Sequence, residues 1–235
     1  MEDQRVKIEV ETPAPDSGVV SIFNYREHLR YPVLKDLEAY WNSIKGDRLV
    51  PARADINPRA IEDMLEYAFV AEHIAPGIAR LRLAGMHLNE LMGMEVRGMP
   101  LTALIAPEYR RVFSDAVEAV FEGPEIVWIT LAGQRAIGKP AMDAKIVFLP
   151  MRAESGDVTR VLGAFVPHGV VGQAPRRFDV LVGKMRSLSS QDDEAVRVDA
   201  KAAVGADVNP DISSNQPDLP KARVYGHLSV LNFDE

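Results

Sequence analysis

Hydrophobic and polar positions alternate with two different periods along this chain of 235 residues, and the changes of period predict the order of its elements. The segment Ala79–Gly98 contains both periods. It opens as a half-buried strand, because Leu81 and Leu83 alternate with arginines. It breaks at Ala84-Gly85, and a short helix is expected over His87–Met92. A strand, a turn and a short helix in this order are typical of a pocket wall and not of a Rossmann unit.

Two longer stretches have apolar positions at helical spacing. The first is Pro32–Lys45, with a proline suited to the first turn and Gly46 suited to the stop. The second is Pro107–Glu122, which carries the most regular apolar stripe. A shorter helix is expected after Asn57-Pro58, an N-cap followed by a first-turn proline. The stripe of the second helix consists of Tyr109, Val112, Phe113, Ala116, Val117 and Val120.

Five strands are expected, each rich in apolar and β-branched residues and bounded by turn residues. They cover Tyr67–Ile74, Ala79–Ala84, Glu125–Ala132, Asp143–Arg152 and Val158–Val166. Two strands, a helical section and three more strands predict an α+β domain with a five-stranded antiparallel sheet and flanking helices.

The N-terminal part of the chain is polar and interrupted by prolines and a glycine. We expect a loose tail over residues 1–28, with one short strand at Val6–Val10. The folded domain, including its N-terminal helix, is expected over residues 29–170.

The C-terminal part changes character twice. A helix is expected within residues 171–190, because four apolar residues of Arg176–Leu188 fall on one side. Residues 191–235 are expected to form a disordered tail, because the first thirty of them hold six Asp, one Glu, three prolines and no aromatic residue. Apolar residues return at Val224–Phe233, which is either a docking segment or an unstructured remnant.

The composition excludes several classes of protein. The net charge of −7 argues against electrostatic binding of nucleic acids or of anionic membranes. No apolar run is long enough to span a membrane, and the first residues do not form a secretory signal. The absence of cysteine removes disulfides, thiolate metal sites and cysteine nucleophiles. Together these features fit a cytoplasmic protein of a bacterium-like cell.

The order of elements resembles that of a PAS domain, through the segments YAFVAEHI, ARLRLAG, ELMGMEVRG, PLTALIAPEYRRVFSDAVEAVFEG and a last strand ending in VTRVLGAFVPHG. The wider pattern is similar to a bacterial family of mostly uncharacterised single-PAS proteins. The motifs are Tyr40-Trp41, a P-x-R-x-D-I-x-P connector at Pro51–Pro58, an R-x-A-G turn at Arg82–Gly85 and a G-x-E-x-x-G step at Gly93–Gly98. The resemblance covers about Pro32–His168 and implies a sensory or regulatory module.

The loop Gly133–Lys139, GQRAIGK, nearly matches the phosphate-binding motif G-x-x-x-x-G-K-[ST]. Pro140 replaces the hydroxyl residue that would hold magnesium, and a strand follows where the motif needs a helix. We therefore expect a hairpin loop.

The histidines do not have the spacing of a helical metal site, so no metal is expected. Some PAS domains hold haem through a histidine on the long helix, but Pro107–Glu122 contains none. His87 is the nearest candidate, and its alternative role is that of a capping or solvent-facing residue. Light-sensing PAS domains need a cysteine beside a flavin, and its absence excludes that photochemistry but not flavin binding. We expect no cofactor.

Arg82 has two possible roles. It binds an anionic head group, or it forms an ion pair with Asp55 or Glu72.

An apolar and aromatic set either lines a ligand cavity between the sheet and the long helix or fills the core. The candidate ligand-binding residues are Arg82, His87, Leu91, Phe113, Val117, Trp128, Phe148 and Phe165.

No carboxylate pair or Ser/His/Asp set can be localised to one site, so we expect no enzyme activity. The expected function is that of a stand-alone PAS module that binds a small molecule or a partner protein. The alternatives are a flavin or haem sensor and a small α+β hydrolase or isomerase.

A homodimer is also expected. The first helix should pack on the outer face of the sheet, at or beside the interface, and its expected interface residues are Leu37, Tyr40 and Trp41.

Overall fold

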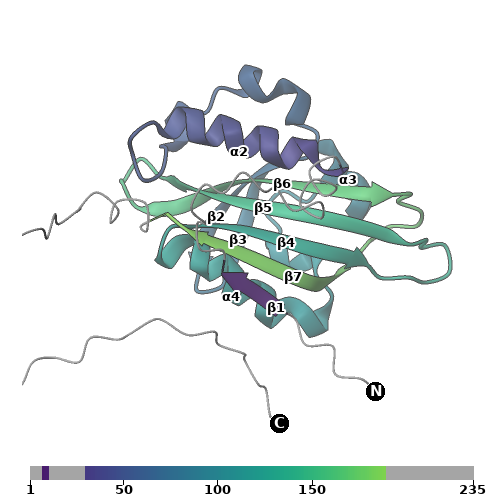
Figure 1. Ribbon diagram of the computed structural model, residues 1–235. Helices are drawn as coiled ribbons and strands as arrows, with labels where there is room; N and C mark the ends of the chain where they lie inside the picture. Colours follow the sequence, from purple (N-terminus) through teal and green to yellow (C-terminus); the bar gives the residue numbers. More distant parts are fainter. Residues whose placement is uncertain (1–6, 11–29, 189–235) are drawn as a thin grey trace, which may run out of the picture. The chain divides into compact units, whose positions relative to one another are not determined.

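The computed structural model describes residues 7–10 and 30–188, and its main feature is a seven-stranded sheet (Figure 1). The strands are β1 Lys7–Val10, β2 Ala68–Ala75, β3 Ile78–Ala84, β4 Glu125–Gly133, β5 Met142–Arg152, β6 Val158–Gly169 and β7 Phe178–Ser187. Their order in the sheet is β1-β7-β4-β5-β6-β2-β3. All neighbouring strands are antiparallel except β1, which runs parallel to β7.

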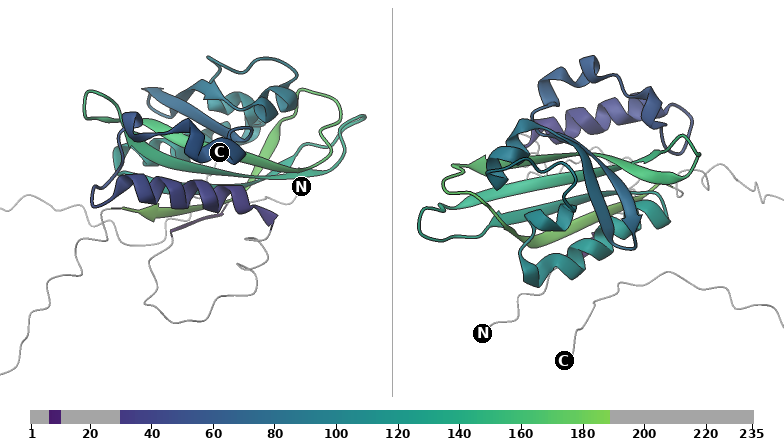
Figure 2. Two further views of the ribbon diagram at one scale, coloured as in Figure 1. Left: turned by 90° about the horizontal axis from the view of Figure 1, so that it is seen from above. Right: turned by 180° about the vertical axis from the view of Figure 1, so that it is seen from behind.

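Within the described residues, three α-helices and four short 3-10 helices accompany the sheet. They are α2 Pro32–Lys45, η1 Arg53–Asp55, η2 Pro58–Met64, α3 Met86–Met92, η3 Leu101–Leu104, η4 Pro107–Tyr109 and α4 Arg110–Glu122. The helix α2 lies on one face of the sheet and α4 on the other (Figure 1). The view from behind shows the β2–β3 hairpin at the edge of the sheet (Figure 2). The α+β class with an antiparallel sheet and flanking helices is therefore confirmed.

Local signals place most of these elements where the sequence predicts them. The helix α2 has its proline in the first turn and stops at Gly46, whose φ of 57° lies in the left-handed region that glycine tolerates. Asn57 caps η2, because its side-chain oxygen accepts a hydrogen bond of 3.1 Å from the N–H of Arg59. The loop Gly133–Lys139 joins β4 to β5 as a hairpin, as expected.

The helix expected over Arg176–Leu188 is wrong. This segment forms β7, which pairs with β4 from Glu125↔Ser187 to Gly133↔Phe178. Its apolar residues satisfy a helical and a strand period equally well over so short a length. The free edge of β4 decides the outcome, because pairing satisfies backbone groups that would otherwise stay open. The sheet thus continues past the domain boundary expected at residue 170, whereas residues 191–235 lie outside the described part.

The sheet buries one hydrophobic cluster on each face. On one face, Phe113, Val117 and Val120 of α4 pack against inward-facing residues of the strands. On the other face, Leu37 and Trp41 of α2 pack against the opposite side of the central strands.

Candidate functional site

The residues expected to surround a ligand cavity mostly come together in the cluster under α4. Leu91, Phe113, Val117, Phe148 and Phe165 are all at most 2% exposed there. The ring centroids of Phe113 and Phe148 are 5.9 Å apart in an edge-to-face arrangement, and other aromatic rings pack on both ends of this set. Such pairs stabilise a core and fill its space. These residues therefore form the core, and a ligand role for them stays a prediction.

Trp128 does not belong to that set. Its side chain lies on the opposite face of the sheet, in the cluster under α2. The guanidinium of Arg186 stacks over its ring at 5.3 Å from the centroid. The reason is the alternation of β4, in which Val127 and Ile129 face α4 and their neighbour must face away.

Two of the expected interface residues are also buried inside the protein. The helix α2 does pack on the outer face of the sheet, and this packing leaves Leu37 and Trp41 with no exposed surface. Tyr40 is half-buried, and its hydroxyl accepts a hydrogen bond of 2.7 Å from the N–H of Asn57. Leu37 and Trp41 therefore cannot contact a partner, because their apolar area is used within the chain.

His87 lies in the first turn of α3. Its ring centroid is 5.2 Å from that of Tyr67, and its Nδ1 is 3.3 Å from a carboxylate oxygen of Glu90.

Among the described residues, no group of three His, Asp or Glu side chains is arranged to hold a metal ion. In the same part of the chain, no helix is long and apolar enough to cross a membrane.

Arg82 forms an ion pair with Glu72, one of the two partners that the sequence suggested. The second oxygen of Glu72 forms an ion pair with Arg160 at 2.8 Å, so one carboxylate connects β3, β2 and β6. Asp55, the other suggested partner, accepts instead from the N–H of Ala52 at 2.8 Å. This backbone hydrogen bond and the nearby Arg48 lower the pKa of Asp55.

The Glu72 ion pairs lie in an open groove of about 1040 Å³, which we call the arginine groove. Four arginines and three glutamates line it, which leaves a formal charge of +1 in a chain of net charge −7. These charged residues come from η1, from β2, β3 and β6, from the loop after α3 and from the β5–β6 turn. They are Arg53, Arg82, Arg97, Arg160, Glu72, Glu95 and Glu154.

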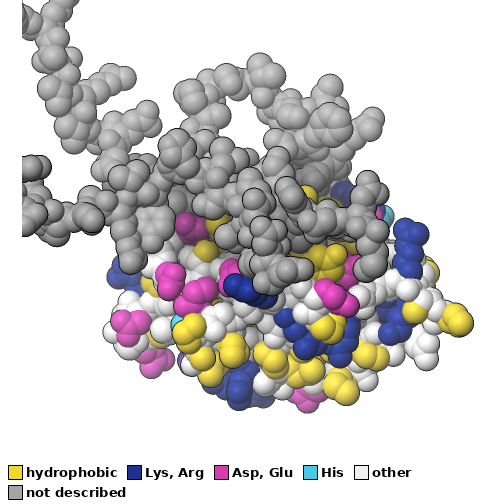
Figure 3. Space-filling model, turned by 90° about the horizontal axis from the view of Figure 1, so that it is seen from below, with side chains coloured by type: hydrophobic (Ala, Val, Ile, Leu, Met, Phe, Trp, Pro, Cys, Tyr) yellow, Lys and Arg dark blue, Asp and Glu magenta, His cyan; other side chains and the backbone are white. Residues whose placement is uncertain are grey.

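The arginine groove also has apolar lining. Val70 and Leu83 stand opposite each other in the β2–β3 pairing, and Leu83 is 52% exposed. On the face seen from below, hydrophobic, basic and acidic side chains are intermixed (Figure 3). In the arginine groove, the apolar pair lies in a hollow bordered by guanidinium groups, and arginine is enriched at protein interfaces.

Two arginines of the groove were not identified from the sequence. Arg53 and Arg97 form no ion pair within residues 30–188, in contrast to Arg82 and Arg160. Both lie inside the motifs that carry the family resemblance, at Pro51–Pro58 and Gly93–Gly98. Their place inside these motifs was the only sign in the sequence that they belong to a site. The tertiary structure shows that they line the same groove as Arg82.

Comparison with known proteins supports the family assignment. A family model described as PAS domain matches residues 29–166. No sequence among the curated proteins matches this chain. Among solved structures, a light-oxygen-voltage domain studied with a flavin analogue has 17% identity and a TM-score of 0.37, over 47% of this chain and 83% of that chain.

Two further solved structures are similar in the same way. The light state of the Aureochrome1 light-oxygen-voltage domain has 16% identity and a TM-score of 0.36, over 47% of this chain and 88% of that chain. An RNA-binding light-oxygen-voltage receptor has 19% identity and a TM-score of 0.33, over 66% of this chain but 36% of the receptor. Scores this low carry no functional argument. The family model, in contrast, spans more than half of the sequence, and the chain therefore belongs to the PAS domain family.

Proposed function

We propose that this chain is a sensory or regulatory PAS module that binds a partner protein at the arginine groove and catalyses no reaction. The observation that carries this proposal is the combination of half-exposed Leu83 with Arg53 and Arg97, two guanidinium groups without an ion pair among the described residues. Arginine is enriched at protein interfaces and among the residues that contribute most to binding.

A partner protein suits the groove better than a small molecule does. The groove is open and its volume of about 1040 Å³ is at the upper limit of small-molecule pockets, which are also mostly apolar and enclose their ligand. Its lining carries both signs of charge. A segment of a partner with a carboxylate for Arg53 or Arg97 and an apolar side chain for Leu83 would be complementary to it.

The absence of catalysis is proposed from the chemistry of the groove. Glu72 forms ion pairs with Arg82 and Arg160, so its carboxylate already has two cationic partners. A general base must take up the proton of the substrate, and a proton on Glu72 would break these two ion pairs. Guanidinium groups do not take this role, because arginine stays protonated in proteins. On these grounds we propose recognition by charge for the groove, and no proton transfer at Glu72.

The test uses the charge-reversal variant R53E/R97E. Arg59, exposed on η2 and without a side-chain ion pair among the residues that the structure describes, supplies the control R59E, which reverses one charge outside the groove. Because all three side chains are exposed, each variant should unfold within about 0.5 kcal/mol of the unmodified protein. Affinity purification from cells then identifies proteins that the wild type and R59E retain and R53E/R97E loses.

The decisive measurement is calorimetry with the purified partner. We expect the wild type and R59E to bind it with equal affinity and R53E/R97E to bind it about tenfold more weakly or worse. Equal affinity for all three proteins would show that the groove is not the binding site. If native mass spectrometry finds a small molecule bound to the wild type and to R53E/R97E alike, and no partner is retained, the proposal fails.

A further inference from the structure

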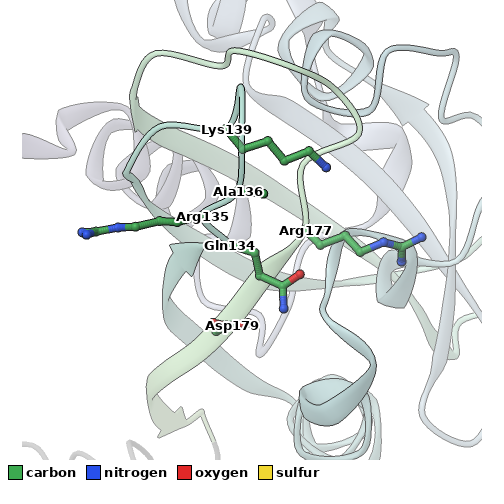
Figure 4. Close-up of a pocket in the computed structure, with 6 residues that line it drawn as sticks. All are labelled: Gln134, Arg135, Ala136, Lys139, Arg177 and Asp179. Atoms are coloured by element: carbon green, nitrogen blue, oxygen red, sulfur yellow. The ribbon is translucent and has the colours of Figure 1, made fainter.

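A second hollow, of about 450 Å³, lies where the β4–β5 hairpin loop meets the beginning of β7 (Figure 4). It is formed by the GQRAIGK loop that nearly matches a phosphate-binding motif, and it is separate from the arginine groove in its lining residues. We call it the hairpin pocket. It is lined by Gln134, Arg135, Ala136, Lys139, Arg177 and Asp179.

The loop does not bind phosphate in the manner of the motif it resembles. The strand β5 follows it, so there is no helix N-terminus to face an anion. The N–H of Lys139 donates to the carbonyl of Ala136 at 2.9 Å, and the N–H of Ala136 donates back at 3.3 Å. These two backbone donors are used within the turn, and the candidate anion ligands are therefore sought among the side chains.

Two cationic side chains extend to the same side of the pocket. Figure 4 shows Lys139 and Arg177 extending in one direction, whereas Arg135 extends in the other. Among the described residues, neither Lys139 nor Arg177 has a carboxylate partner. The ammonium of Lys139 donates to the carbonyl of Pro175 at 2.8 Å, and Arg177 donates to that of Ala103 at 3.4 Å. Neutral carbonyls leave the charges uncompensated, and both groups have further N–H donors for a ligand.

The loop is held rigidly by a buried arginine. Arg176 is completely buried, and it donates to the carbonyls of Pro140 at 2.8 Å, Gln134 at 3.4 Å and Val171 at 2.6 Å. These contacts tie both ends of the hairpin loop to the β6–β7 connection. A pre-ordered loop loses little conformational entropy when it binds a ligand. Arg176 also places a positive charge beneath the pocket, because arginine stays protonated even when burial lowers its pKa.

Asp179 adds an acceptor to this basic pocket. One of its carboxylate oxygens is buried and has no hydrogen-bond partner among the described residues. Burial raises the pKa of Asp179, and a hydrogen bond from the Gln134 side chain opposes this shift. That oxygen is closed off from the pocket, so a ligand hydroxyl would donate to the other oxygen, which can accept from Gln134 and from the ligand at once.

We propose that the hairpin pocket binds a small hydroxylated phosphate ester, such as a sugar phosphate. Lys139 and Arg177 bind the phosphate group, which is close to a dianion at neutral pH. Asp179 accepts from a hydroxyl of the sugar. A volume of about 450 Å³ holds a phosphate with a small organic group attached and is larger than a free phosphate needs. This proposal does not depend on the arginine groove.

The experiment titrates the full chain with ribose 5-phosphate, inorganic phosphate, ribose and acetate by calorimetry. We expect ribose 5-phosphate to bind most tightly, inorganic phosphate to bind more weakly, and ribose and acetate not to bind. K139Q and R177Q should each weaken ribose 5-phosphate about tenfold or more, because each removes a charge-assisted hydrogen bond.

Two further variants make the test specific. Arg135 extends away from Lys139 and Arg177, so R135Q removes the same charge from the same pocket without removing a ligand contact. It should lower the affinity for ribose 5-phosphate by less than about threefold, a change that reflects the weaker long-range field alone. D179N should weaken ribose 5-phosphate but not inorganic phosphate, which it should bind slightly more tightly because a negative charge is removed from the pocket.

Three results would overturn the proposal. They are the absence of saturable binding of ribose 5-phosphate to the wild type, an equal loss in R135Q and R177Q, and equal affinities for inorganic phosphate and ribose 5-phosphate. Melting temperatures confirm folding, and if K139Q does not fold, R177Q alone decides, because its 3.4 Å contact with Ala103 contributes little to the fold.

Discussion

The indole Nε1 of Trp41 donates a hydrogen bond of 2.9 Å to the carbonyl of Pro150, and both residues are buried. This contact joins the middle of α2 to the central strand β5, across 109 positions of the sequence. It orients the largest side chain of α2 toward the sheet. Trp41, which the sequence suggested as an interface residue, thus helps to attach α2 to the sheet.

Replacing Trp41 with phenylalanine tests the energetic weight of this contact. W41F keeps an aromatic ring but leaves the buried carbonyl of Pro150 without its donor, which costs about 1–3 kcal/mol. We expect a lower melting temperature in calorimetry. W128F is the control, because Trp128 is only half-buried and its exchange should cost less. Equal stability of W41F and wild type would show that the hydrogen bond is unimportant for folding.

A charge in the α4 core should destabilise the protein strongly. Val117 is 2% exposed and packs against the sheet, so V117D buries a carboxylate without a partner. The expected loss is about 3 kcal/mol or more, measured by denaturant unfolding. D115N, a change of charge of the same size and opposite sign at an exposed position of α4, should have almost no effect. A soluble V117D protein with an unchanged melting temperature would contradict the core assignment.

The carboxylate of Glu125 should make stability depend on pH. Burial raises its pKa above the ordinary value of 4.5, and one of its oxygens is buried without a hydrogen-bond partner among the described residues. The free energy of unfolding therefore falls as the pH rises from 4.5 through the higher pKa of Glu125 in the folded state, because its carboxylate ionises more easily in the unfolded chain. We expect E125Q to melt at a higher temperature than wild type at pH 7.

The same difference should disappear below about pH 4, where the carboxyl is protonated in the folded and the unfolded state alike. E122Q, at an exposed position of α4, controls for the loss of a surface charge. A constant difference between E125Q and wild type from pH 4 to pH 8 would mean that burial of the carboxylate is not its cause.

The purified protein should be colourless. The helix α4 contains no histidine, the chain contains no cysteine, and Phe113 and Phe148 occupy space between α4 and the sheet. A haem or flavin in this position would have to displace packed aromatic rings. An absorption spectrum after gel filtration, with and without prior incubation with flavin mononucleotide, measures this. A haem or flavin band that stays with the protein would refute it.

We also expect a homodimer with α2 beside the interface. Since Leu37 and Trp41 face the sheet, the contacts between copies must come from the outward side of α2, where Ala39 is exposed. Sedimentation velocity at tens of micromolar should therefore give the mass of a dimer. A39R should shift it toward the monomer, whereas R59E on η2 should not. A monomeric wild type would exclude the dimer and leave the fold unaffected.

Local chemistry determined much of this protein. The bounds of α2 follow from a proline in the first turn, an apolar stripe and Gly46, all within one short segment. The five strands β2 to β6 and the hairpin loop Gly133–Lys139 follow in the same way, because period-2 alternation and turn residues act over a few positions. The pairing of Arg82 with Glu72 was also foreseeable, since both lie on neighbouring strands of one hairpin.

Tertiary structure decided the rest, because the deciding contacts join distant segments. The segment Phe178–Ser187 became a strand only through the open edge of β4. Trp128 faces α2 because the sheet fixes which side of each strand meets which helix. The arginine groove needs η1, the β2–β3 hairpin, the loop after α3 and the β5–β6 turn at once. No local period relates Arg53 to Arg97, so their convergence on Arg82 depends on the fold that brings these segments together.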